Sequence, residues 1–308
     1  MLKILTSNEF LNHDTGSHPE SIDRYRTIKK LFKDKFNHHT QYSNRLAKLE
    51  DLKLCHEENY INHILDNIPS SDFYYYDPDT KACPKSLNSY LNAVGICLDA
   101  IDKIFTTKNP IDVFCGVRPP GHHAETNKAM GFGVFNNIAI AARYAISKYK
   151  VNKILIVDFD VHHGNGTQEI FFNDSRVSYA SSHQFPFYPG TGSLEEIGKN
   201  NIFNCPLPGE TKSDTFRNLF SKNIIDKITE SFDLIMFSAG FDAHYSDPLA
   251  SINLTEEDFY WATTEICDKF ANDKSVLSVL EGGYNMDGLY NSLNSHLNAL
   301  IDFRSKRV

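Results

Sequence analysis

Residues 154–168, ILIVDFDVHHGNGTQ, decide how the rest of this 308-residue sequence is interpreted. Four apolar residues form the body of a buried strand, and two aspartates, two histidines and two glycines follow it. Burying polar groups without partners costs roughly several kcal/mol for each group, so such a strand end needs an explanation. The stretch predicts a strand of a covered sheet, over residues 153–161, with a functional site at its carboxyl end.

Four more apolar runs have the same character, at residues 112–117, 176–181, 232–240 and 275–283. Runs that are apolar on both faces are typical of a parallel sheet covered by helices. Apolar residues at helical spacing predict helices over 86–105, 136–149 and 255–271, and the last opens with a threonine cap. The alternation predicts the α/β class, with one domain over residues 1–308 and a mainly parallel sheet flanked by helices.

Charge and composition exclude several classes of protein. A net charge of −8 and a pI of about 5.9 argue against a broad nucleic-acid surface, which needs a basic face. No window has the apolar length of a membrane span, and the apolar run at the start is too short for a secretory signal. The six scattered cysteines include no C-x-x-C pair. We therefore expect a cytoplasmic protein with reduced thiols and with neither nucleic acid nor membrane as a partner.

Two segments lack regular patterning. Residues 70–86, SSDFYYYDPDTKACPKS, predict a long surface loop, and FRSKRV at 303–308 predicts a frayed basic end.

Polar clusters follow the ends of all five predicted strands. They read RPPGHHAE after 112–117, DFDVHHG in and after 153–157, SSH after 176–180, GFDAH after 232–238 and EGGYN after 275–280. In open α/β sheets the binding crevice lies outside the carboxyl ends of the strands. The five clusters are therefore expected to converge on one site.

Three of these residues have the character of metal ligands. Asp158, Asp160 and His162 alternate along an extended chain and can share one face. The set Asp160, His162 and Asp242 leaves one coordination position open for water, as catalytic sites do. Two anionic ligands offset a divalent charge, and nitrogen and oxygen donors suit zinc or iron(II). An isolated D-x-D is more often a loop or cap feature, but polar clusters at the ends of all five predicted strands favour a metal site.

Seven motifs, in order, resemble the zinc-dependent histone deacetylase family, and most of all its class II and bacterial branch, which includes acetylpolyamine amidohydrolases. They are RPPGHHAE, GFGVFNN, DFDVHHGNGTQ, FYPGTG, SAGFDAH, DPLA and EGGYN. HDTGSHPESIDRYRTI at 13–28 resembles the family's N-terminal motif, so the resemblance spans nearly the whole chain. It implies the arginase/deacetylase fold and the hydrolysis of an N-acetyl group from an amine, usually a lysine side chain.

The resemblance also assigns the chemistry of the site. It places zinc on Asp160, His162 and Asp242, and it makes Tyr284 the tyrosine that donates to the developing oxyanion. Some family members carry histidine at that position and deacetylate poorly, so Tyr284 favours a working enzyme.

The tandem histidines fall at the family's acid–base position. We favour His123 as general base and acid and His122 as its electrostatic partner, although the sequence alone leaves this division open. Asp158 matches the acceptor that orients the first histidine, and Asn165 matches the acceptor of the second.

The substrate tunnel and an internal channel are implied in the same way. Phe132 and Tyr188 match the two aromatic walls of the acetyl-lysine tunnel, and Gly131 and Gly133 match its floor. Arg24 matches the arginine of the acetate-release channel.

Family members also hold two structural monovalent cations, K⁺ or Na⁺. The residues that match the first site are Asp158, Asp160, His162, Ser181 and Ser182, and those that match the second, mainly through backbone carbonyls, are Phe171, Asp174, Val177 and Asn201.

Two other functions stay open. Polyamine-preferring members carry an acidic residue where this chain has Leu249, which favours acetyl-lysine in a peptide or protein as the substrate. Asp77 or Asp79 could still supply that charge for a small acetylated amine. A catalytically inactive acyl-lysine binding module is disfavoured by the intact site. The physiological substrate, the acyl length, the native metal and the oligomeric state stay open.

Overall fold

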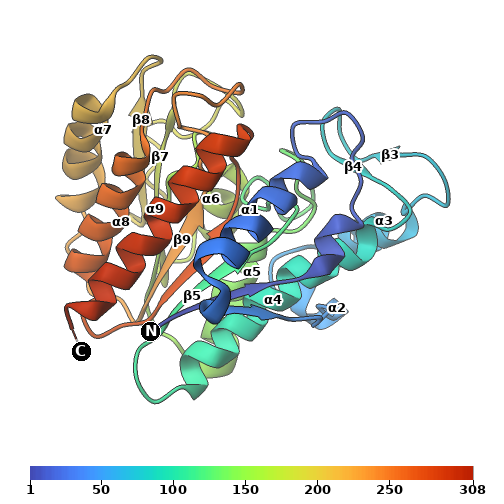
Figure 1. The fold of residues 1–308 in the computed structure, drawn as a ribbon, viewed down its shortest axis with the longest axis horizontal. Coiled ribbons are helices and arrows are strands. Elements are labelled where there is room, and N and C mark those ends of the chain that lie inside the picture. Colours follow the sequence, from blue (N-terminus) through green and yellow to red (C-terminus); the bar gives the residue numbers. More distant parts are fainter. Residues whose placement is uncertain (308) are drawn as a thin grey trace.

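The computed structural model describes residues 1–307, and its centre is an eight-stranded sheet in which all neighbouring strands are parallel (Figure 1). The strand order is β2-β1-β5-β10-β9-β6-β7-β8. The strands are β1 (Leu2–Thr6), β2 (Thr40–Tyr42), β5 (Asp112–Gly116), β6 (Ile154–Asp158), β7 (Val177–Gln184), β8 (Ile202–Leu207), β9 (Leu234–Ala239) and β10 (Val276–Leu280).

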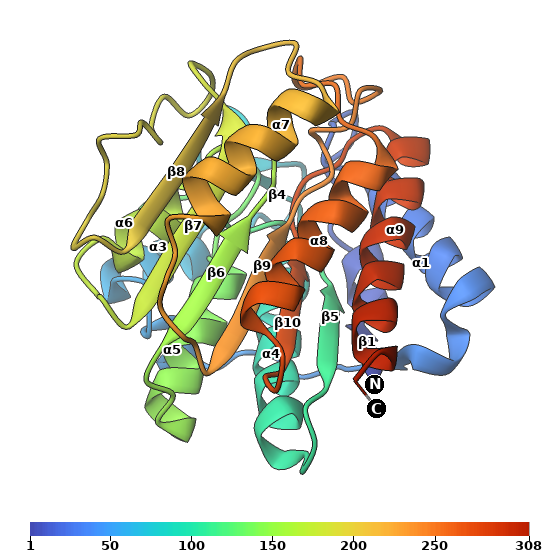
Figure 2. The ribbon, with the colours of Figure 1, turned by 90° about the vertical axis from the view of Figure 1, so that its left-hand side faces the viewer.

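Helices cover both faces of this sheet. Figure 2 shows α7, α8 and α9 in front of it and α4 and α5 behind it. The α-helices are α1 (Ile22–Lys35), α2 (Leu49–Leu52), α3 (Glu58–Asp66), α4 (Ser86–Thr106), α5 (Asn137–Tyr149), α6 (Asn165–Phe171), α7 (Ser213–Phe220), α8 (Glu256–Phe270) and α9 (Met286–Ser305). Shorter turns form η1 (Asn8–Leu11), η2 (Asn37–His39) and η3 (Ser221–Ile225).

This architecture confirms the predicted α/β class with a parallel sheet and helices on both sides. The three predicted helices correspond to α4, α5 and α8, and the five predicted strands to β5, β6, β7, β9 and β10. Two strands end earlier than predicted, at Asp158 and Leu280, because the polar residues after them turn into the site. The third of the five extends further: β7 runs to Gln184 and pairs with β8, so Ser181, Ser182 and His183 lie within a strand and not after one.

The segment 70–86 is more ordered than the predicted surface loop. It contains the hairpin β3 (Tyr74–Tyr75) and β4 (Lys81–Ala82), and Thr80 and Cys83 are buried. The hydroxyl of Thr80 accepts a 3.1 Å hydrogen bond from the backbone N–H of Phe132. The loop prediction was therefore wrong for residues 80–83, because most of this part of the segment is buried and Thr80 contacts Phe132.

The prediction of a frayed basic end was also wrong for the described residues. Helix α9 continues to Ser305, and Phe303 and Arg304 are buried. The Nε of Arg304 donates to Asp112 at 2.9 Å, which ties the end of the chain to the first residue of β5. Val308 lies outside the described residues.

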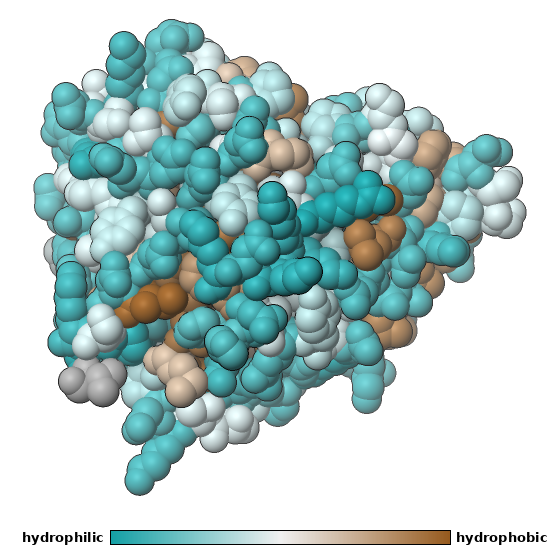
Figure 3. Space-filling model, viewed as in Figure 1, coloured by the Kyte–Doolittle hydropathy of each residue, from teal (hydrophilic) through white to brown (hydrophobic). Residues whose placement is uncertain are grey.

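Apolar side chains from both faces of the sheet form one core. The face drawn in Figure 3 is mostly hydrophilic, with apolar residues in small separate patches. All six cysteines are buried and unpaired. None of the helices in residues 1–307 has both the length and the apolarity that crossing a membrane requires.

The strand order explains where a site can form. Strands β5, β10, β9 and β6 are consecutive neighbours and parallel, so their carboxyl ends meet at one edge. The segments that follow them carry four of the polar clusters found in the sequence. Segments far apart along the chain are thus brought to one crevice, as the strand-end rule predicts.

Candidate active site

A cavity of about 260 Å³ opens at this edge of the sheet. Gly131, Phe132 and Tyr188, which match tunnel positions of the family, line it together with Leu249, whereas Gly133 is not among the lining residues. The remaining lining residues are Asp79, His123, His162, Phe187 and Tyr284. The cavity therefore has aromatic walls and ends on polar groups.

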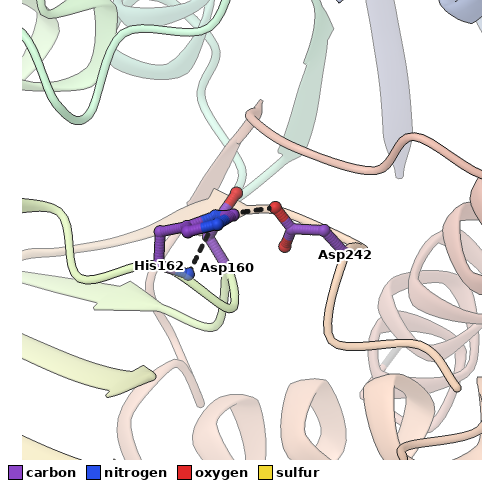
Figure 4. Close-up of side chains that lie close together, drawn as sticks. All are labelled: Asp160, His162 and Asp242. Atoms are coloured by element: carbon purple, nitrogen blue, oxygen red, sulfur yellow. Dashed lines mark hydrogen bonds and ion pairs between the residues drawn. The ribbon is translucent and has the colours of Figure 1, made fainter. Parts of the chain in front are cut away.

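Asp160, His162 and Asp242 form a buried cluster at the base of this cavity (Figure 4). One donor atom from each residue lies within 4.8 Å of the other two. The Nδ1 of His162 is 3.2 Å from an oxygen of Asp160 and 3.2 Å from an oxygen of Asp242. Two carboxylates and one imidazole nitrogen therefore face a common point.

Backbone N–H groups hold the two carboxylates in place. Gly282 donates to Asp160 Oδ2 at 2.8 Å, and Val161 donates to Asp242 Oδ1 at 2.8 Å. A Cβ atom on Gly282 would lie 2.2 Å from Asp242 Oδ2 and 2.5 Å from Asp160 Oδ2, so only glycine fits there. The motif EGGYN therefore requires glycine at position 282, because the backbone passes so close to both carboxylates.

The cluster carries more negative charge than its surroundings balance. Burial, and then the charge of Asp160, raise the pKa of Asp242 to about 7. Burial opposes a charge on His162, but hydrogen bonds to Asp160 and Asp242 raise its pKa to about 10. A raised pKa means that the two buried carboxylates favour an added proton, and for the same electrostatic reason they favour a bound cation. Two oxygens and one nitrogen with room for a further ligand suit zinc or iron(II), so these residues fit such an ion.

His122 lies between two carboxylates. Its Nδ1 is 2.9 Å from Asp158 Oδ2, and its Nε2 is 3.8 Å from Asp160 Oδ1. Burial opposes its charge, but Asp158 and then Asp160 outweigh it and raise the pKa of His122 to about 10. Asp158 also accepts a 2.9 Å hydrogen bond from the Tyr179 hydroxyl. Both carboxylates therefore favour the charged form of His122.

His123 has a different environment, although its ring centroid is only 4.1 Å from that of His122. Its Nδ1 is 2.8 Å from Asn165 Oδ1, while Asn165 Nδ2 donates to Glu125 at 2.7 Å. Since Glu125 can only accept, this orientation of the amide makes Nδ1 of His123 the protonated nitrogen. Burial and the neighbouring His122 hold the pKa of His123 well below its usual range. The Nε2 of His123 is therefore left as a base, on a residue that lines the cavity.

Gly131 makes room for this ring. It adopts a φ of +59°, and a Cβ atom there would lie 2.1 Å from Cδ2 of His123. A side chain at this position would therefore displace the histidine.

Tyr284 lines the cavity next to Phe132, and the two rings are in edge-on contact with their centroids 5.6 Å apart. Burial raises the pKa of Tyr284 well above its usual value, so its hydroxyl keeps the proton it would donate. The backbone N–H of Tyr284 donates to Asp247 Oδ2 at 2.6 Å, and that of Leu249 donates to Asp247 Oδ1 at 3.0 Å. Asp247 thus fixes two lining residues at once.

Three acidic residues of the site were missed by the sequence interpretation. Glu125 orients Asn165, Asp247 holds Tyr284, and Glu281 accepts from the backbone N–H groups of Gly121 and His122 at 2.7 and 3.1 Å. All three fall inside or next to the motifs after strand ends. Position in a motif was a signal, but the sequence does not show which neighbour each one contacts.

Arg24 is buried on α1, behind the ring of Tyr284. Its Nε donates to the carbonyl of Gly283 at 2.7 Å, and its guanidinium lies 4.8 Å from the centre of the Tyr284 ring. Glu20 provides its counter-charge at 3.3 Å. The structure therefore places Arg24 beside the site and not on an exposed helix face.

The first set of monovalent-site residues lies around the carboxyl end of β6, and the second lies where α6 passes into β7. Asp158 lies opposite Ser181 in the β6–β7 pairing, next to Asp160 and His162. In the second set, the carbonyls of Phe171, Asp174 and Val177 converge on the side-chain nitrogen of Asn201.

Comparisons with known proteins agree with this geometry. Residues 18–300 match the family model described as Histone deacetylase domain. The chain is 33% identical to "Histone deacetylase 14, chloroplastic" of Arabidopsis thaliana, over 94% of this chain and 74% of that one. It is 32% identical to "Probable deacetylase" of Archaeoglobus fulgidus, over 92% and 82% of the two chains. Among solved structures, that titled "Crystal Structure of HDA15 HD domain" matches with a TM-score of 0.88 and 32% identity, over 97% of this chain and 90% of that chain.

Proposed function

Because the chain belongs to the histone deacetylase family, we propose that it is a zinc-dependent amidohydrolase that removes acetyl groups from amines. The observation that carries this proposal is the convergence of the Asp160, His162 and Asp242 cluster, His123 and Tyr284 on one cavity. Iron(II) suits the same donors and is the alternative metal.

The residues divide the reaction among them. A zinc ion at the cluster would polarise the amide carbonyl and activate the attacking water. His123 takes the proton of the water on Nε2 and returns it to the leaving nitrogen, since its Nδ1 is occupied by Asn165. Tyr284 donates to the carbonyl oxygen as that oxygen gains charge. His122 does not line the cavity, and its positive charge balances Asp158 and Asp160.

The favoured substrate is an acetyl-lysine side chain in a peptide or protein. The rings of Phe132 and Tyr188 suit an aliphatic lysine stem, and Leu249 adds an apolar contact at the cavity. Tyr188 is 41% exposed, which places it at the open end.

A small acetylated amine is the second candidate, because the carboxylate of Asp79 also lines the cavity. That charge could attract a second cationic amine. The test compares Asp79→Asn with the matched control Asp72→Asn, which changes an exposed carboxylate of the same segment that does not line the cavity. If a diamine is the substrate, Asp79→Asn lowers kcat/KM for N-acetylputrescine at least about tenfold and spares an acetyl-lysine peptide. Equal effects on both substrates would leave the peptide as the favoured one.

The proposed activity is tested by Tyr284→Phe. This change keeps the ring and its packing and deletes the donor, so kcat on an acetyl-lysine peptide is expected to fall by about 10²–10³-fold. KM, zinc content and thermal stability should stay unchanged. A trifluoroacetyl-lysine peptide, whose carbonyl is already electron-poor, should lose less. Full activity in this variant would refute the role of Tyr284.

Turnover itself separates an enzyme from an acyl-lysine binding module. The parent protein should hydrolyse acetyl-lysine peptide, lose this activity with a chelator and regain it with zinc. Binding of the peptide without any hydrolysis would favour the module.

The six buried, unpaired cysteines support a reducing location such as the cytoplasm.

A further inference from the structure

A ring of carbonyl oxygens lies where α6 passes into β7. The side-chain nitrogen of Asn201, at the residue before β8, is 2.9 Å from the carbonyl of Phe171, 3.3 Å from that of Asp174 and 2.8 Å from that of Val177. We call these three oxygens and this nitrogen the carbonyl ring. Asn201 is buried, so solvent does not compete for the ring.

Convergent backbone carbonyls can bind a monovalent cation, but here the carbonyl oxygens already accept hydrogen bonds from the protein. The carbonyl of Phe171 also accepts from the N–H of Asp174 at 3.0 Å, and that of Asp174 accepts from the N–H of Val177 at 3.1 Å. A carbonyl oxygen has two lone pairs, so both of these oxygens have two donors already. The backbone carbonyl of Asn201, the fourth expected ligand, accepts from Tyr179 at 2.8 Å. The ring therefore does not fit an additional cation.

The orientation of the amide is set from its other end. Asn201 Oδ1 accepts a 2.9 Å hydrogen bond from the backbone N–H of Lys199. Exchanging the oxygen and nitrogen of the amide would place an NH₂ group against that N–H and an oxygen against three carbonyls. Gly198, with a φ of +56°, allows the close approach, since a Cβ there would lie 2.7 Å from Oδ1.

Positive charge is also present next to the ring. Arg143 forms an ion pair with the side chain of Asp174, and Arg176 pairs with the same carboxylate at 2.7 Å. The guanidinium of Arg143 lies 5.0 Å from the centre of the Phe171 ring. The carboxylate of Asp174 is therefore already paired with two guanidinium groups and leaves no unbalanced negative charge that would attract a cation to the carbonyl ring.

We propose that the side-chain amide of Asn201 takes the place of a second monovalent cation, so that the carbonyl ring is complete without one. The two N–H groups supply the partial positive charge that the three carbonyls require. Removing the nitrogen should then turn the ring into a cation site. This inference depends on the fold alone and is independent of the proposed catalytic roles.

The test uses Asn201→Asp, which replaces the nitrogen by an oxygen and makes the ring all acceptors, and Asn201→Ala, which removes the amide. The matched control is Asn204→Ala, which deletes another buried amide of β8 that contacts Gln168 and Ser193 instead of the ring. Zinc-loaded proteins are unfolded thermally in KCl and in tetramethylammonium chloride at equal ionic strength. Crystals are soaked in Tl⁺, a K⁺ substitute that is visible by anomalous scattering.

We expect a Tl⁺ peak at the carbonyl ring in the Asn201 variants and none there in the parent protein. The variants should also gain at least about 3 °C in Tm from K⁺, beyond any gain in the parent or in Asn204→Ala. A Tl⁺ ion bonded to the carbonyls of Phe171, Asp174 and Val177 in the parent would overturn the proposal. So would folded Asn201 variants without added K⁺ dependence. If the variants do not fold, the parent crystal still decides the question.

Discussion

The Asp160, His162 and Asp242 cluster and the carbonyl ring are both buried sets of oxygen atoms near β6 and β7, but they differ in how their charge is balanced. In the cluster, two carboxylates face one imidazole nitrogen, and the pKa values of His162 and Asp242 are raised to about 10 and about 7. In the carbonyl ring, an amide from the chain itself supplies the donors. Convergent oxygens therefore do not by themselves predict an ion, and what predicts one is the charge and bonding capacity that the protein leaves uncompensated.

The largest expected effect comes from Asp242→Ala, which tests whether the cluster needs a cation. Loss of one of three ligands should remove tight metal binding and lower kcat/KM by at least about 10³-fold, because the metal ion supplies several kcal/mol of transition-state stabilisation. Metal content after dialysis and turnover on an acetyl-lysine peptide are the measurements. Asp268→Ala, which removes an exposed partner of Arg307, is the control and should change neither. Near-stoichiometric zinc in Asp242→Ala would contradict the ligand assignment.

His123→Ala tests the base that borders the cluster without belonging to it. Loss of a positioned proton-transfer group should lower kcat by about 10²–10⁴-fold. Zinc content should stay at the parent level, because His123 contributes no atom to the three-residue cluster. A variant in which only KM rises would make His123 a binding residue.

Glu125→Gln tests whether the negative charge of Glu125 acts on His123 through Asn165. The side-chain oxygen of the introduced glutamine can still accept from Asn165, but the negative charge behind the Asn165–His123 hydrogen bond is lost. Partners of this kind typically contribute about 10–100-fold, and we expect a kcat about tenfold lower with zinc and KM unchanged. In an Asn165→Ala background, where no side chain links Glu125 to His123, the same change should have less effect. Equal losses in both backgrounds would show that Glu125 acts on folding of the loop and not through Asn165.

The sequence predicted the charged site better than the neutral one, for a physical reason. Carboxylates and histidines at strand ends are expensive to bury without partners, so Asp160 and Asp242 stand out in an apolar context. Strand β8 was missed because IFNCPL contains Asn204 and Pro206 and lies at the edge of the sheet. Strand β2 at the other edge, TQY, has no apolar pattern at all.

The carbonyl ring could not be anticipated in this way. Backbone carbonyls are the same at every residue, and their convergence depends on the turn between α6 and β7. Nothing in the sequence around Asn201 indicates whether this residue binds a cation or whether its side-chain amide takes the place of one. The same limit applies to Asp247, whose partners Tyr284 and Leu249 come from two different loops.

The smallest expected effect concerns Asp174, whose side chain balances charge beside the ring. Hydrogen bonds from Arg176 lower the pKa of Asp174 to about 2. A carboxylate with a lowered pKa stabilises the fold above its unfolded pKa of about 4 and loses that contribution as the pH falls towards about 2. Because the pair is partly exposed, Asp174→Asn should cost at most about 1 kcal/mol at pH 7. Urea unfolding at pH 7 and pH 3 measures the difference from the parent, with Asp66→Asn as an exposed control. A difference that is as large at pH 3 as at pH 7 would mean that Asp174 acts through packing and not through charge. The ion pairs of Asp174 with Arg143 and Arg176 would then not contribute to the charge balance of the carbonyl ring.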